Sequence, residues 1–98
     1  MTHEKFMRRA MTCAKKAADL GEVPVGAVIV RDGKVIATGY NKREIGKNAL
    51  LHAEMIAIHR ACRKLGGWRL FDCDLYVTLE PCPMCTGAII NSRIRRVY

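Results

Sequence analysis

Four residues have the types and the spacing for metal-assisted chemistry: His52, Glu54, Cys82 and Cys85. Cys82 and Cys85 stand three positions apart in the run PCPMC, and His52 precedes them by thirty positions. Two cysteines at this spacing at the start of a helix lie on one face of its first turn and can bind one metal ion. Pro83 suits the first helical position, where no backbone N–H is needed, and a helix N-terminus favours negatively charged sulfur. A nitrogen from His52 completes a donor set that suits zinc.

Three protein ligands leave a tetrahedral zinc ion with one open position, whereas structural zinc sites close all four. Glu54, two residues after His52, is the candidate base for a water molecule at that position. Two residues along a helix correspond to about 200° of rotation. We therefore expect His52 and Glu54 to flank the first turn of a helix that points end-on at the metal.

At these residues the chain resembles the zinc-dependent deaminases of nucleobases and nucleosides, whose pattern is H-x-E followed by P-C-x-x-C. The similarity extends over essentially the whole chain and points to the bacterial tRNA-specific adenosine deaminases. The runs that carry it are GEVPVGA (21–27), NKRE (41–44), TLEPCPMCTGA (78–88) and SRI (92–94).

The resemblance implies that His52, Cys82 and Cys85 hold one zinc ion and that Glu54 shuttles protons while water replaces the amine at C6 of adenine. It also implies a wobble adenosine in a tRNA anticodon loop as substrate, inosine as product, and a homodimer. Asn41 falls where these enzymes place a base-contacting asparagine, and its amide can both donate to and accept from a purine edge. The alternative for Asn41 is an Asx turn that ends a strand.

Two alternatives stay open on the residues alone. Within the same chemistry, the substrate could be a free base or nucleoside such as guanine or cytosine, because the metal ligands do not read the substrate. Asn41, the basic residues that follow it and the net charge favour RNA. From a different class, a structural zinc module without catalysis would recruit His59, Cys62 or Cys73 as its fourth ligand.

Composition limits the remaining choices. A chain of 98 residues has room for one domain and one modest core, and its formal charge of +8 suits a polyanionic partner. Five cysteines, an odd number, argue against a disulfide framework. Charged residues interrupt every apolar run well before the roughly 20 residues that cross a bilayer, and no signal-peptide pattern is present. We expect a cytoplasmic protein without a membrane segment.

The order of predicted elements gives the fold class. We expect a helix over 2–20, a hairpin of strands 23–30 and 34–40, and a basic loop over 41–50. A helix over 52–65, a strand over 74–79, a helix over 83–91 and the start of a fourth strand at 95–98 would follow. This is an α/β chain, a three-layer α/β/α deaminase-like fold around a mixed sheet. Relative to the family it reads as one domain, 1–98, that is incomplete after the start of the fourth strand. Trp68 is expected to pack against the sheet, and the alternative is an exposed indole that stacks on a base.

Overall fold

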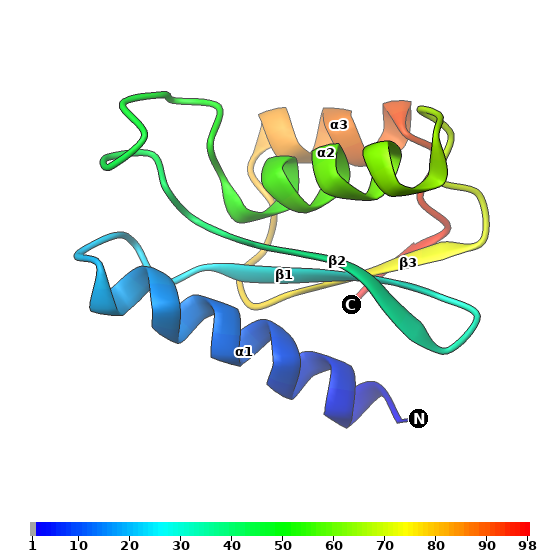
Figure 1. The fold of residues 1–98 in the computed structure, drawn as a ribbon, viewed down its shortest axis with the longest axis horizontal. Coiled ribbons are helices and arrows are strands. Elements are labelled where there is room, and N and C mark those ends of the chain that lie inside the picture. Colours follow the sequence, from blue (N-terminus) through cyan, green and yellow to red (C-terminus); the bar gives the residue numbers. More distant parts are fainter. Residues whose placement is uncertain (1) are drawn as a thin grey trace.

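The computed structural model describes residues 2–98, and its core is a four-stranded mixed sheet between helices (Figure 1). The spatial strand order is β2-β1-β3-β4, with β1 antiparallel to both of its neighbours and β4 parallel to β3. In chain order the elements are α1 (His3–Asp19), β1 (Gly26–Arg31), β2 (Lys34–Tyr40), α2 (Ala53–Leu65), β3 (Cys73–Val77), α3 (Pro83–Asn91) and β4 (Arg96–Val97).

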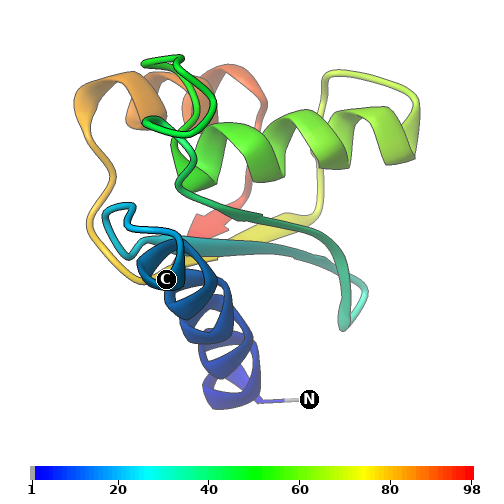
Figure 2. The ribbon, with the colours of Figure 1, turned by 60° about the vertical axis from the view of Figure 1, so that its left-hand side comes forward.

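The helices lie on both faces of the sheet, which makes three layers. Helix α1 lies against one face, while α2 and α3 lie side by side over the other, as the two views show (Figures 1 and 2). The predicted α/β/α class is therefore confirmed. No helix among residues 2–98 combines the length and the apolar character needed to span a membrane.

Strand β1 is central and buried on both faces, as its unbroken apolar run predicts. Val28 and Val30 face α1 and pack with Phe6, whereas Ala27 and Ile29 belong to the cluster beneath α2 and α3. The period of two along a strand thus splits one apolar run between two cores. The central strand is held from both sides, and the ends of β1 and β2 are fixed beside the helix that carries His52.

Two glycines allow the helices to approach the sheet closely. A side chain at Gly26 would collide with the backbone of α1 at Ala10 and Ala14, and one at Gly39 would collide with the backbone carbonyl of Ala53. Because both strands come this near to helix backbone, only glycine fits. The contact at Gly39 sets the distance between β2 and the first turn of α2.

Helix termini follow the predicted signals, and strand boundaries differ by a few residues. The Thr2 side chain accepts a hydrogen bond from the Lys5 N–H at the start of α1, and Gly66 ends α2 with a left-handed φ of 75°. Strand β1 begins at Gly26 rather than at residue 23, because Pro24 has no N–H to give a sheet ladder.

The prediction for Trp68 is wrong. Its side chain is 51% exposed, and the guanidinium groups of Arg69 and Arg93 lie 4.1 and 5.5 Å from its ring centroid. The indole therefore packs against charged groups at the surface and not against the sheet.

Candidate metal centre and active site

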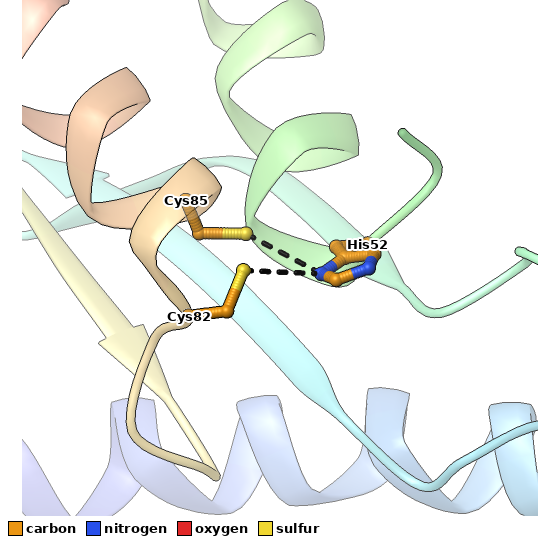
Figure 3. A group of neighbouring side chains, drawn as sticks. All are labelled: His52, Cys82 and Cys85. Atoms are coloured by element: carbon orange, nitrogen blue, oxygen red, sulfur yellow. Dashed lines mark hydrogen bonds between the residues drawn. The ribbon is translucent and has the colours of Figure 1, made fainter. Parts of the chain in front are cut away.

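The N-termini of α2 and α3 meet at the candidate site (Figure 3). His52 is the N-cap residue of α2, and Cys82 is the N-cap residue of α3. Pro83 follows Cys82 at the start of the helix, as predicted, and Cys85 lies one turn into it. Both helices direct the positive ends of their dipoles at this point, which favours thiolate sulfur.

The distances among the three side chains fit a tetrahedral zinc ion. The Nδ1 atom of His52 lies 3.7 Å from Cys82 Sγ and 3.6 Å from Cys85 Sγ, and the ligand atoms all lie within 4.8 Å of one another. Zn–N bonds of about 2.0–2.1 Å and Zn–S bonds of about 2.3 Å at tetrahedral angles place nitrogen and sulfur about 3.6 Å apart. The cluster is therefore positioned to bind zinc without rearrangement.

The two thiols differ in their electrostatic surroundings. A hydrogen bond from the Cys85 backbone N–H lowers the pKa of Cys82, because it stabilises the thiolate. Burial raises the pKa of Cys85, and the negative charge of Glu54 raises it further. In the metal-free chain, Cys82 is the readier thiolate, and a cation at the site would have to displace the proton of Cys85.

Glu54 lies where the end-on arrangement predicts it. It is the second residue of α2, only 4% exposed, and close enough to Cys85 to affect its pKa. His52 precedes the helix in extended conformation, and both residues line the same cavity despite their spacing. The predicted convergence of His52 and Glu54 is confirmed.

A cavity of about 140 Å³ opens beside the cluster. Its walls come from the loop before β1, the loop after β2, the start of α2 and the segment before α3. The lining residues are Val23, Val25, Asn41, Arg43, His52, Ala53, Glu54, Leu79, Glu80 and Cys82. A metal ligand, a buried carboxyl group and an amide thus share one cavity, which is the arrangement expected of a small active site.

Asn41 forms the Asx turn that is one of its two predicted roles, and its side chain also lines the cavity. Its Oδ1 accepts a hydrogen bond of 3.3 Å from the Arg43 N–H, the Asx turn, and its Nδ2 donates to the Val23 carbonyl at 3.4 Å. The side chain is 6% exposed and still lines the cavity. An amide offers two donors and two acceptor lone pairs, so capacity remains for a ligand.

The sequence analysis missed Glu22. This residue is 5% exposed, and its two carboxylate oxygens accept hydrogen bonds from the backbone N–H groups of Glu44 and Ile45, at 3.1 and 2.7 Å. It therefore ties the loop before β1 to the loop after β2, and both loops line the cavity. The available signal was a single carboxylate beside an otherwise apolar run.

None of the candidates for a fourth protein ligand joins the cluster. Among the described residues, the His/Cys/Asp/Glu group that could hold a metal consists of His52, Cys82 and Cys85. His59 lies farther along α2 and is exposed, and Cys73 is a fully buried member of the apolar core. Cys62 packs at the margin of that core.

Comparison with known proteins assigns this site to a family. The model of the cytidine and deoxycytidylate deaminase zinc-binding region matches residues 1–98, and the chain belongs to this family. Zinc is therefore the cofactor for which the His/Cys/Cys cluster is positioned.

Individual relatives within the family include proteins named as tRNA adenosine deaminases. The chain is 52% identical over 94 residues to the tRNA-specific adenosine deaminase of Bacillus subtilis (strain 168), covering 96% of the chain and 58% of that protein. It is 59% identical over 91 residues to the chloroplastic tRNA(adenine(34)) deaminase of Arabidopsis thaliana, covering 93% of the chain and 7% of that protein. The chain thus spans under two thirds of the length of these relatives.

Solved structures agree on the fold. A guanine deaminase from Bacillus subtilis superposes with a TM-score of 0.95 at 47% identity, over 99% of this chain and 62% of that one. A structure from a study of A-to-I editing by tRNA:A34 deaminases at the wobble position of transfer RNA superposes with a TM-score of 0.94 at 48% identity. The match covers 97% of this chain and 73% of that one.

Proposed function

We propose that this chain carries the catalytic centre of a zinc-dependent tRNA adenosine deaminase, which converts the wobble adenosine of an anticodon loop to inosine. The observation that carries the proposal is the cluster of His52, Cys82 and Cys85, of which His52 and Cys82 line the same cavity as Glu54 and Asn41. The named tRNA adenosine deaminases that are about half identical to the chain support the substrate.

The chain's own residues have two proposed roles, metal binding and proton transfer. His52, Cys82 and Cys85 would hold zinc, which supplies a Lewis acid that lowers the pKa of water. Glu54 accepts a proton from the attacking water and passes protons to the adenine ring nitrogen and to the departing amine. A C–O bond forms at C6, the C–N bond breaks, and ammonia leaves. Burial of Glu54 keeps bulk water from competing for the proton.

An RNA substrate suits the surroundings of the cavity. The loop between β2 and α2 carries Lys42, Arg43 and Lys47, and Arg43 lines the cavity itself. Cationic side chains on a loop beside the cavity favour a phosphate backbone, and an anticodon loop offers unstacked bases that can enter a pocket without breaking a duplex. Asn41 is the proposed contact to the base edge.

The decisive variant is Glu54→Gln. It should keep one zinc ion per chain by elemental analysis and lose inosine formation on an anticodon stem-loop, because the amide cannot carry the proton. Glu4→Gln, an exposed change on α1, is the matched control and should leave activity unchanged. Retained deamination in Glu54→Gln would remove this residue from the mechanism.

The assay should also include a version extended past Tyr98, and activity in that version alone would reject the competence of the 98-residue chain.

A second candidate is deamination of a free base, which the likeness to a guanine deaminase favours. The metal ligands cannot separate the two candidates, since they do not contact the distinguishing parts of the substrate. Product formation on an anticodon stem-loop, free guanine, cytosine and adenosine decides between them. A turnover confined to guanine would replace the RNA proposal.

A structural zinc module would show four protein ligands. X-ray absorption should instead detect one light-atom ligand beside one nitrogen and two sulfurs, since His59, Cys62 and Cys73 lie outside the cluster. A shell of protein nitrogen and sulfur alone would favour the module.

We also propose that residues 1–98 form one domain, that the protein acts as a homodimer, and that it works in the cytoplasm. One sheet carries both apolar clusters, which supports a single domain. Leu79 and Val97 are 58% and 43% exposed near the β4 edge, and such apolar surface favours association. Five free cysteines suit a reducing compartment. Sedimentation velocity of the zinc-loaded chain tests the dimer.

A further inference from the structure

Helix α1 lies on the side of the sheet opposite to α2 and α3 (Figure 2), and its outward face carries a stripe of positive charge. Exposed cations recur along it at helical spacing: Lys5, Arg8, Arg9, Lys15 and Lys16. We call these residues the α1 cationic face. No Asp or Glu lies between residues 5 and 16, and Glu4 and Asp19 stand outside its two ends. The proposed mechanism uses none of these side chains.

A hollow of about 210 Å³ lies along this face. Its lining residues are Lys5, Phe6, Arg8, Arg9, Thr12 and Val35. Three cations therefore border one concave surface, where positive potential is concentrated. Glu4 pairs with Arg8, but among residues 2–98 the other cations of the face form no ion pair. Their charge is available to a polyanion.

The packing of α1 excludes a membrane as that polyanion. An amphipathic helix that binds a membrane surface inserts its apolar side between the lipids. The apolar side of α1 is already packed on the sheet, where Phe6 is 5% exposed and Ala10 is fully buried. Between residues 5 and 16, Met11 is the one large apolar side chain that is exposed. The helix has no second apolar side to insert.

The α1 cationic face also lacks what single-stranded RNA requires. Proteins bind single strands by stacking the bases on aromatic side chains, and no aromatic residue is exposed between residues 5 and 16. A duplex keeps its bases stacked inside and presents phosphates, which cations contact without reading the sequence. A row of lysines and arginines without an aromatic residue therefore favours double-stranded RNA.

The position of α1 relates this face to the active site. The C-terminal end of α1 and the N-terminal ends of α2 and α3 lie on the same side of the molecule (Figure 1). Val23, which lines the active-site cavity, follows the end of α1 at Asp19 by four residues. The Lys16 end of the face is therefore the end nearer the cavity. From Lys5 to Lys16 the helix rises about 16 Å, the length of about five base pairs of duplex.

We propose that the α1 cationic face binds the phosphate backbone of the helical stem that presents the target loop, an inference that rests on the proposed function. The stem would lie along α1, with its loop end toward Lys16 and the cavity. Such phosphate contacts position a substrate and add affinity that does not depend on the stem sequence. The chain would thereby distinguish a loop closed by a stem from the same nucleotides in a linear strand.

The first test compares two labelled RNAs by fluorescence anisotropy with the zinc-loaded chain: a stem-loop, and its loop alone as a linear strand. The double variant Arg9→Gln/Lys16→Gln should bind the stem-loop about tenfold more weakly, with the slope of log Kd against log salt reduced by about 2. Its affinity for the linear strand should not change. Arg63→Gln/Lys64→Gln is the matched control, because it removes the same charge from exposed positions of α2. Equal losses on the two RNAs, or in the two double variants, would overturn the proposal.

The second test locates the contact on the RNA. Uncharged methylphosphonate links replace the phosphates of one stem strand. They should weaken binding of the unsubstituted chain and of Arg63→Gln/Lys64→Gln, but cost Arg9→Gln/Lys16→Gln little more. Exchanging base pairs within the stem should leave all three affinities unchanged. Full sensitivity of Arg9→Gln/Lys16→Gln to the uncharged links would overturn the proposal, because the stem would then contact another surface.

Further outcomes separate this inference from its foundation. A stem-loop that binds through Arg9 and Lys16 but stays unedited would reject the deaminase function and keep the α1 cationic face as a duplex site. An edited stem-loop whose Kd ignores both positions would do the reverse. If Arg9→Gln/Lys16→Gln keeps its affinity for the stem-loop and instead loses binding to phosphatidylserine vesicles, the face binds membranes and the RNA assignment is wrong.

Discussion

The carboxylate of Glu22 accepts a 2.7 Å hydrogen bond from the backbone N–H of Ile45, twenty-three residues later in the chain. With a second bond from the Glu44 N–H, a single buried side chain joins two loops that both line the active-site cavity. Charge-assisted bonds of this kind are stronger than neutral ones, and they hold Arg43 and Asn41 in place relative to Val23.

Glu22→Ala should destabilise the chain by about 1–3 kcal/mol, because two backbone N–H groups lose their acceptor in a largely buried setting. Urea unfolding monitored by circular dichroism measures this loss. Because the variant loosens the cavity wall and leaves the metal ligands intact, KM for the anticodon stem-loop should rise more than kcat falls, at unchanged zinc content.

Glu22→Gln distinguishes positioning from simple packing. It keeps the shape and one acceptor oxygen, so it should recover part of the stability and part of KM. Glu44→Gln removes an exposed carboxylate that makes no bond to Glu22, because only the backbone N–H of residue 44 does so. This variant should therefore change neither stability nor KM. A Glu22→Ala chain that unfolds at the original urea concentration would show that the loops are held by other contacts.

Gly26→Ala should be among the most disruptive small substitutions in the molecule. Its Cβ would collide with α1 backbone, which has no flexible atom to move aside, so we expect a loss of about 1–3 kcal/mol or more in unfolding free energy. Gly87→Ala is the matched control, since nothing lies within 4 Å of its added Cβ. In the interior of α3 that change should stabilise by about 0.5–1 kcal/mol. Equal effects at both positions would contradict close packing at Gly26.

Local signals predicted the metal cluster and the layers, whereas contacts between distant loops were invisible to them. The spacing of Cys82 and Cys85 and the proline between them place two sulfurs on one helical turn. This placement depends only on the first turn of α3, so the local sequence is enough to predict it. The bond from Glu22 to Ile45 depends on how two loops come together in space. No periodicity or spacing encodes it.

Trp68 is a second residue whose surroundings depend on contacts between distant parts of the chain. A large aromatic residue after a helix is commonly buried, yet here two arginines, one of them twenty-five positions later, pack against its ring. Arg93 reaches the indole only because the turn after α3 passes close to the end of α2. A prediction based on residue type alone has no access to that contact.

Thiol reactivity should follow the electrostatics of the cluster. In the metal-free chain at about neutral pH, iodoacetamide should modify Cys82 first, because its lowered pKa leaves more thiolate. Burial raises the pKa of Cys62 and Cys73, so both should react slowly. Peptide mass spectrometry over a time course measures the order, and added zinc should protect Cys82. Modification of Cys62 or Cys73 ahead of Cys82 would contradict this assignment.

Zinc affinity should rise with pH, and the sign follows from Cys85. Burial, with Glu54 nearby, raises the pKa of Cys85, so this thiol is protonated at neutral pH in the metal-free chain and must lose its proton when zinc binds. Each displaced proton strengthens binding by about tenfold per pH unit, so affinity should increase at least about tenfold between about pH 7 and about pH 8. Competition with a chromophoric chelator measures the affinity, and calorimetry in buffers of different ionisation enthalpy counts the released protons. Cys85→Ser should bind zinc weakly and with a flatter pH dependence. An affinity that stays constant over this range would mean that Cys85 is already a thiolate before the metal arrives.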